Sequence, residues 1–194
     1  MGKDNQILLF FMKFASRAGE KLEHAIREFK ISVKGLVCAD FGSSTGGFVD
    51  CLLQNGAEKV YAVETGYGVL DWKLRNDNRV VVMERINAMH VDLPEKVDFI
   101  TIDTSWTRLE NIIPSALKNL KPAGKIITLL KPHYEVESKM LRKGKLQEEL
   151  IPNVLGLVKN NLGEIDVEII GETESPLVGQ KGGNKEYLLY LKRK

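Results

Sequence analysis

The sequence predicts an α/β fold in which helices cover both faces of a mostly parallel β-sheet. Seven short runs of apolar and β-branched residues alternate with helical patterns along the 194 residues. A glycine-rich turn follows the first of these runs, as happens where a parallel strand passes into a helix. The length favours one domain, because a chain of this size can bury a single hydrophobic core.

The elements are expected in alternating order. The first helix, 19–30, is amphipathic because its apolar residues recur at i, i+3, i+4 and i+7: Leu22, Ala25, Ile26 and Phe29. Strands are expected at 36–41, 59–64, 80–84, 98–103, 125–130, 165–170 and 185–191. The other helices are expected at 46–55, 69–76, 109–120 and 148–161, and the third of these has the clearest apolar stripe.

The turn after the first strand has the composition of a ligand-binding loop. Asp40 lies near the end of the strand, and the loop contains Gly42, Ser43, Ser44, Thr45, Gly46 and Gly47. Such a loop directs free backbone N–H groups and a helix N-terminus at a ligand. Glu64 ends the second strand 22 residues after Gly42, where a carboxylate can hold ribose hydroxyls. The spacing G-x-x-x-G-G lacks the middle glycine that admits a pyrophosphate, so we favour S-adenosylmethionine over a dinucleotide.

Further polar residues are expected at the same edge of the sheet. Ligands of parallel sheets bind beyond the carboxyl ends of the strands. Asn87, Asp103 and Lys131 each stand at such an end, together with Gly42 and Glu64. These positions therefore predict a binding site built from several strand ends and not from the glycine-rich loop alone.

Charge and composition bound the function only loosely. The net charge is +2, but basic residues cluster at 139–145 and 181–194, which suits either a phosphate backbone or solvated loops. Cys38 and Cys51 are expected to be buried free thiols, and the three histidines form no metal-binding pattern, so no metal is expected. No stretch approaches the length of a membrane span, and the apolar run 7–12 is expected to pack on the domain or on a partner.

Seven phrases of the sequence resemble, in order, the motifs of one family. They are SRAGEKLE from Ser16, DFGSSTGGFVDC from Asp40, YAVETGYG with DWKLR from Tyr61, ERINA from Glu84, IDTS from Ile102, LKP from Leu130 and GNKEY from Gly183. The chain is similar to the TlyA haemolysin-like family of FtsJ-type ribosomal RNA 2′-O-methyltransferases. The match spans about Phe14 to Lys192.

The resemblance implies a Rossmann-like methyltransferase fold with an antiparallel last strand, S-adenosylmethionine as cofactor, and ribosomal RNA or a ribosomal subunit as cytoplasmic partner. It implies a catalytic tetrad of Lys21, Asp103, Lys131 and Glu186. By the same matching, Glu64 would hold the ribose and Asn87 would lie near the adenine. The chain would consist of an extension, 1–15, and a methyltransferase domain, 16–194.

The sequence also departs from the family pattern. Family members usually carry a small RNA-binding domain before the position of Ser16, where only fifteen residues stand here. His133 replaces the usual glutamine, Glu64 replaces the usual aspartate, and the glycine-rich lid is altered around 143–145. The polar loop 135–145 remains a candidate lid.

A ribose hydroxyl is a weak nucleophile, so methyl transfer needs a group that accepts its proton. We expect Lys131 to be this base, Lys21 to disfavour a second positive charge beside it, and Asp103 and Glu186 to orient the two amines. Each residue also has an interpretation without a catalytic role. Lys21 would be a solvated helix lysine and Lys131 a loop lysine. Asp103 would cap a turn, and Glu186 would be a strand residue paired with another charge. Trp106 and Tyr134 follow two motif loops and would either stack on a nucleotide or pack at the rim, whereas Phe48 and Trp72 are assigned to packing.

Three other functions remain open at this point. A small-molecule O-methyltransferase would need a closed, apolar acceptor pocket. A catalytically reduced cofactor- or RNA-binding haemolysin-like protein would bind S-adenosylmethionine without transferring its methyl group. An NAD-linked reductase is less favoured because the second glycine of its fingerprint is absent.

Overall fold

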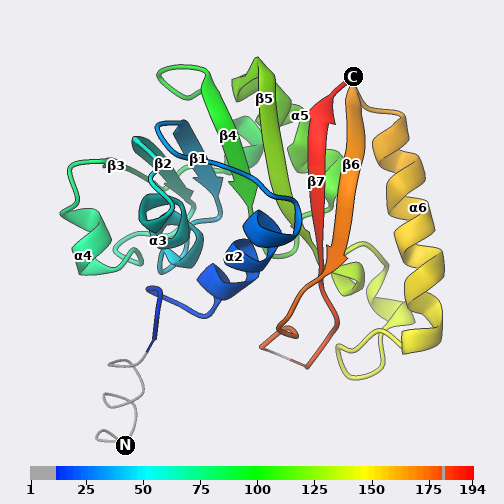
Figure 1. Ribbon diagram of the computed structural model, residues 1–194. Helices are drawn as coiled ribbons and strands as arrows, with labels where there is room; N and C mark the ends of the chain where they lie inside the picture. Colours follow the sequence, from blue (N-terminus) through cyan, green and yellow to red (C-terminus); the bar gives the residue numbers. More distant parts are fainter. Residues whose placement is uncertain (1–11, 181) are drawn as a thin grey trace, which may run out of the picture.

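A computed structural model describes residues 12–180 and 182–194 of the chain. Most of the apolar run 7–12 and Lys181 therefore lie outside the described residues. One sheet of seven strands runs through the molecule in the order β3-β2-β1-β4-β5-β7-β6 (Figure 1). The strands are β1 (Val37–Phe41), β2 (Lys59–Glu64), β3 (Val80–Glu84), β4 (Val97–Ile102), β5 (Leu120–Leu130), β6 (Val167–Glu174) and β7 (Tyr187–Arg193).

All strands run parallel except β7, which is antiparallel to both of its neighbours, β5 and β6. This arrangement confirms the seven-stranded, mostly parallel sheet with an antiparallel last strand. The strands alternate with α2 (Ala18–Glu28), α3 (Gly47–Gln54), α4 (Trp72–Arg75), α5 (Leu109–Asn119) and α6 (Ile151–Gly163).

Two hydrophobic cores lie on opposite faces of the sheet. One core packs α2 and α3, through residues such as Leu22 and Leu52, against the sheet. The other packs α5 and α6, through residues such as Ile113 and Val158, against the opposite face. Figure 1 shows α2 and α3 in front of the strands and α5 behind them. Phe14 also belongs to the first core, so the packed part of the chain includes residues ahead of Ser16.

Several elements differ from their predicted bounds for local reasons. The helix predicted at 69–76 is reduced to Trp72–Arg75, because Asp71 caps its N-terminus by accepting a hydrogen bond from the backbone N–H of Lys73 at 2.8 Å. Trp72, assigned to packing, is 73% exposed, so that assignment is wrong. Strand β7 begins at Tyr187, two residues later than predicted, which places Glu186 just before the strand rather than inside it.

The register of the sheet brings the predicted site residues to one edge. Phe41 pairs with both Val63 and Ile102, so the residues that follow these three in the chain, Gly42, Glu64 and Asp103, are neighbours. Leu130 pairs with Tyr187 across the antiparallel ladder. Lys131, which follows Leu130, and Glu186, which precedes Tyr187, therefore flank the same pair.

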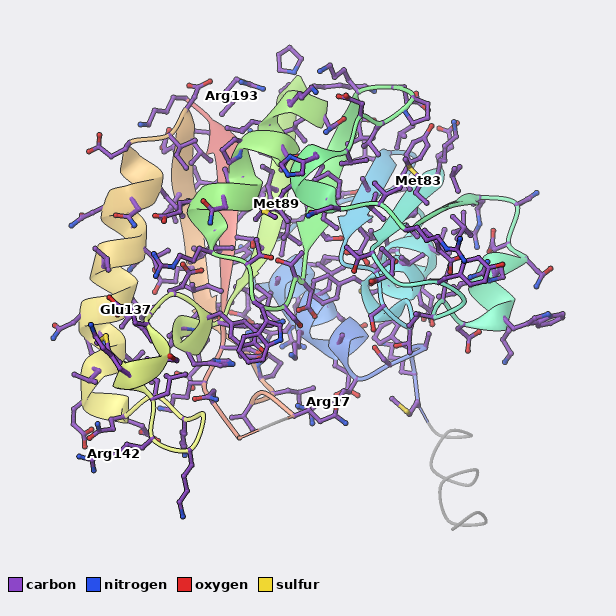
Figure 2. The ribbon with its side chains drawn as sticks, turned by 180° about the vertical axis from the view of Figure 1, so that it is seen from behind. Arg17, Met83, Met89, Glu137, Arg142 and Arg193 are labelled. Carbon is purple, nitrogen blue, oxygen red and sulfur yellow. The ribbon has the colours of Figure 1, made fainter. Side chains whose placement is uncertain are left out.

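Basic residues lie at two opposite edges of the molecule. Figure 2 shows Arg17 and Arg142 at one edge of the molecule and Arg193 at the opposite edge. The last basic residues of the chain are also paired: Lys192 with Glu168 at 2.9 Å and Arg193 with Asp166 at 3.0 Å. Lys192 and Arg193 thus do not flank the predicted site, and for these two residues the structure favours solvated, ion-paired positions. Lys185 of the same cluster directly precedes Glu186 and lies 3.7 Å from Glu148.

Candidate active site

The glycine-rich loop keeps its backbone open to a ligand because two glycines have positive φ angles. Gly42 has φ +88°, and a Cβ there would lie 2.7 Å from the carbonyl oxygen of Asp103. Gly46 has φ +98° and forms the N-cap of α3. A Cβ on Gly46 would collide with the side chains of Leu70 and Leu74. Only glycine therefore fits at positions 42 and 46. The loop directs the N-terminus of α3 toward the site.

Glu64 and Asn87 line a cavity of about 370 Å³ beside this loop. The carboxylate of Glu64 accepts backbone hydrogen bonds from Ser44 at 2.9 Å and from Gly66 at 2.8 Å. The bond from Ser44 holds the end of β2 against the glycine loop. Asn87 accepts a hydrogen bond from the N–H of Met89 at 2.9 Å, which caps the short turn Ala88–His90. Ile86, Ala88 and Met89 supply an apolar wall.

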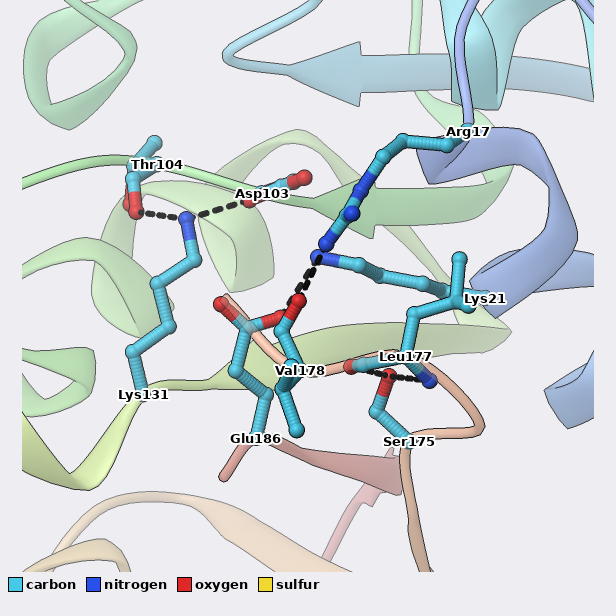
Figure 3. A network of polar contacts seen from close by, with 9 residues as sticks. All are labelled: Arg17, Lys21, Asp103, Thr104, Lys131, Ser175, Leu177, Val178 and Glu186. Carbon is cyan, nitrogen blue, oxygen red and sulfur yellow. Dashed lines mark hydrogen bonds and ion pairs between the residues drawn. The ribbon is translucent and has the colours of Figure 1, made fainter. Parts of the chain in front are cut away.

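The four predicted tetrad residues line a second cavity of about 440 Å³, which shares Gly42, Ser44 and Asp103 with the first. They form two ion pairs (Figure 3). Lys21 Nζ lies 2.5 Å from Glu186 Oε2, and Lys131 Nζ lies 2.5 Å from Asp103 Oδ1. Lys131 also donates to the carbonyl oxygen of Thr104 at 3.1 Å.

The two ion pairs differ in burial. The side chains of Lys21 and Glu186 are 8% and 4% exposed, whereas those of Lys131 and Asp103 are 11% and 18% exposed. The pattern of helix 19–30 alone would have made Lys21 a solvated lysine. It is buried instead because α2 packs against the segment before β7, where Glu186 supplies its partner. Removing one member of a buried pair leaves the other charge uncompensated, so both must be present.

Most other residues of the glycine loop line the larger cavity, whereas Gly46 has a structural role. Ser43, Ser44, Thr45 and Gly47 line the larger cavity, as does Asp40, while Gly46 acts through its cap geometry. Burial raises the pKa of the Asp40 carboxyl to about 8, although the hydroxyl of Thr101 donates to it at 2.6 Å. The nearby charges of Asp103 and Glu64 act in the same direction as burial. Asp40 is therefore mainly protonated at neutral pH.

Aromatic rings form the rim of the larger cavity. Trp106 is 82% exposed and has φ +59°, a strained conformation for a bulky residue that is more common at functional sites. Its ring centroid lies 4.7 Å from that of Tyr134, and Lys131 Nζ lies 5.6 Å from the Tyr134 centroid. Phe48 is buried, as its assignment to packing predicted.

The predicted lid is fixed by a residue that the sequence analysis did not single out. Arg142 and Lys145 pair across a tight turn whose central residues, Lys143 and Gly144, both have positive φ. Buried Asn184 accepts from the N–H of Leu146 at 3.0 Å and donates to the carbonyl of Gly144 at 3.1 Å. Asn184 belongs to the matched phrase GNKEY, so that motif was the signal that could have identified it.

Arg17 is a second missed residue. It lines the larger cavity, and its guanidinium donates to the carbonyl oxygen of Val178. Figure 3 shows its side chain beside Lys21 and toward the loop that leads to Glu186. It stands in the matched phrase SRAGEKLE, and its position next to the N-terminus of α2 could have suggested a site role.

Outside this edge, the described residues show neither a reactive thiol nor a metal site. Cys38 and Cys51 are free and buried, and burial raises the pKa of each thiol to about 12. The described residues hold no group of three or more potential metal ligands. Among them, no helix has both the length and the apolar character to cross a membrane.

The fold and this edge define a Rossmann-like methyltransferase. Its strand order places one antiparallel strand next to last in the sheet, and a G-x-x-x-G-G loop with a carboxylate after β2 opens onto two joined cavities. The carboxylate, the apolar wall near Asn87 and the open glycine backbone fit the ribose, adenine and amino-acid parts of S-adenosylmethionine.

The chain belongs to the FtsJ-like methyltransferase family, whose model matches residues 14–193. It is an S-adenosylmethionine-dependent methyltransferase. It is 40% identical to Hemolysin A of Brachyspira hyodysenteriae, over 97% of this chain and 80% of that protein. It is 37% identical to the 16S/23S rRNA (cytidine-2′-O)-methyltransferase TlyA of Mycobacterium tuberculosis, over 92% of this chain and 68% of that protein.

A solved hemolysin-like structure from Streptococcus thermophilus is similar with a TM-score of 0.90 and 36% identity. The similarity covers 94% of this chain and 68% of that one. The family predicted from the seven phrases is thereby confirmed.

Proposed function

We propose that this protein methylates the ribose 2′-oxygen of a nucleotide in ribosomal RNA and acts in the cytoplasm. The observation that carries the proposal is the pair of lysine–carboxylate contacts that line one cavity beside the glycine loop. A relative with 37% identity is described as a cytidine-2′-O-methyltransferase of 16S and 23S rRNA, which supports this substrate class.

When bound, S-adenosylmethionine supplies a methyl group whose bond to sulfur breaks as the bond to the 2′-oxygen forms. Lys131 accepts the hydroxyl proton on Nζ, for which the ammonium that is ion-paired with Asp103 must first lose a proton. Asp103 and the carbonyl oxygen of Thr104, at 2.5 and 3.1 Å, fix the direction in which that amine points. The ammonium of Lys21, held by Glu186, opposes a second positive charge in the cavity and donates toward the hydroxyl oxygen.

The rim suits a nucleotide taken out of its stack. Exposed Trp106 and the neighbouring ring of Tyr134 offer flat faces to a base, and stacking on such rings is worth roughly 1–3 kcal/mol per base. A small-molecule O-methyltransferase needs a closed, apolar acceptor pocket. Here charged residues line the cavity, and an exposed tryptophan stands at its rim.

The test is methyl transfer from labelled S-adenosylmethionine to ribosomal subunits, with the modified nucleoside identified by mass spectrometry. We expect Lys131→Ala to lower the rate by roughly 10²–10⁴-fold, the range typical for loss of a general base. Lys125→Ala is the matched control, because Lys125 lies on the same strand, β5, away from the cavity. A Lys131→Ala protein that transfers at nearly the normal rate refutes the role of Lys131. Transfer to small phenols but not to RNA refutes the substrate class.

A further inference from the structure

His133 is a buried polar residue that the proposed mechanism does not use. It lies in the turn Pro132–Tyr134 directly after Lys131, is 8% exposed and lines the larger cavity. Its Nδ1 atom is buried and has no hydrogen-bond partner within the described parts of the chain. Buried polar atoms are nearly always hydrogen-bonded, so the unpartnered Nδ1 limits which tautomer of the ring is present.

The charge state of the ring limits what it can do. Burial and the neighbouring charge of Lys131 lower the pKa of His133 to about 4, so the imidazole is neutral at pH 7. A neutral imidazole has one N–H donor and one acceptor nitrogen. A buried N–H without a partner is rarer than a buried acceptor without one, so Nδ1 carries the lone pair and Nε2 the hydrogen. Because Nδ1 is sealed off, Nε2–H is the group that faces the cavity.

The position of the ring suggests which atom would accept this hydrogen. The His133 ring centroid lies 4.1 Å from that of Tyr134, which lies 4.7 Å from that of Trp106. A base stacked on these aromatic rings would lie next to the imidazole. A phosphate would be bound better by a charged donor, whereas a neutral N–H suits an uncharged acceptor on a base.

We propose that His133 is a substrate-positioning residue whose Nε2–H donates a hydrogen bond to an acceptor atom, O2 of a pyrimidine or N3 of cytosine, on the base of the nucleotide whose ribose is methylated. The inference rests on the proposed RNA methyltransferase function and adds a base contact to it. The contact would hold the base, and through it the ribose, in register with Lys131.

Two variants of His133 separate hydrogen bonding from packing. His133→Gln keeps an N–H donor, whereas His133→Leu keeps similar bulk and removes the donor. KM and kcat for ribosomal RNA are measured for each variant, together with the unfolding temperature and the calorimetric affinity for S-adenosylhomocysteine. His90→Leu is the control, because His90 is an exposed histidine outside both cavities.

We expect His133→Leu to lower kcat/KM roughly 10-fold, mainly through KM, as loss of one hydrogen bond to a base predicts. His133→Gln should stay within about 3-fold of the wild type, and cofactor affinity should not change in either variant. Wild-type kinetics in His133→Leu, equal losses in both variants, or a parallel loss of cofactor affinity and unfolding temperature would each overturn the inference. A wild-type protein that methylates no ribosomal RNA would instead overturn the proposed function, and this inference with it.

Discussion

Asp40 is a single residue whose environment changes the stability of the whole protein with pH. Its carboxyl group lies in the sheet, with the Thr101 hydroxyl at 2.6 Å, and burial raises its pKa to about 8. In the unfolded chain the group has an ordinary pKa near 4. Between these values the folded state holds a proton that the unfolded state has lost. Stability therefore falls as pH rises through this window.

Asp40→Asn should remove this dependence, because the amide is uncharged at every pH and its oxygen can still accept from Thr101. We expect the free energy of unfolding of the variant, relative to the wild type, to rise from pH 5 to pH 7 by up to about 1.4 kcal/mol per pH unit. Urea unfolding at the two pH values measures the difference. Glu135, whose pKa burial raises to about 7, contributes in the same direction but equally in both proteins. A pH-independent difference would show that Asp40 is charged in the folded protein.

The sequence predicted residues that line the candidate site, but not which side chains pair with one another. Lys21 and Glu186 lie 165 positions apart, and no pattern in either segment shows that they pair with each other rather than with Asp103 and Lys131. The same holds for Asp40 and Thr101, 61 positions apart. Matched phrases indicate which residues share a site, whereas side-chain pairing depends on strand register and helix placement.

We propose that cofactor binding depends on the glycine loop between β1 and α3. Gly42→Ala places a Cβ 2.7 Å from the carbonyl oxygen of Asp103 at a φ of +88°, so the loop must shift. We expect calorimetric affinity for S-adenosylhomocysteine to fall at least 10-fold, because a strained or displaced loop costs on the order of 1–3 kcal/mol. Asp103 would move as well, so transfer should fall with binding.

Gly163→Ala is the matched control for this loop. Gly163 is the last residue of α6, and a Cβ there would contact nothing within 4 Å. Alanine is favoured over glycine in a helix by about 1 kcal/mol, so this variant should bind normally and unfold at an equal or slightly higher temperature. Equal affinity in Gly42→Ala and Gly163→Ala would show that the loop tolerates a side chain and does not approach the ligand closely.

Strands were better predicted than the short helix at this scale. β2, an inner strand, and β3, an edge strand, have the bounds that their apolar runs predict, because polar residues bound each run. Residues 69–76 contain apolar residues at helical spacing, but Leu70 packs over Gly46 from an irregular segment before the helix. A contact between a loop residue and a distant glycine leaves no periodic pattern in the sequence. The conformation of residues 69–71 could therefore not be predicted from the sequence.

The whole molecule has a net charge of only +2, so the RNA binding that we propose must depend on where its charges lie. The site edge carries Arg17 and the turn 142–145, which Asn184 holds in place. The opposite edge carries Lys118, in the last turn of α5, paired with Asp92. Counterion release makes phosphate contacts depend steeply on salt, so the two edges should respond differently to charge reversal.

Arg142→Glu and Lys118→Glu make the same change in net charge at the two edges. Both side chains are exposed, so neither change should alter folding. We expect Arg142→Glu to raise the KM for ribosomal RNA several-fold and to lower the slope of log affinity against log salt by about 1, as loss of one phosphate contact predicts. Lys118→Glu should leave both quantities unchanged, since its edge faces away from the site. If the two variants weaken RNA binding equally, net charge rather than the turn attracts the RNA, and the site edge would have to recognise its substrate through the cavity rim alone.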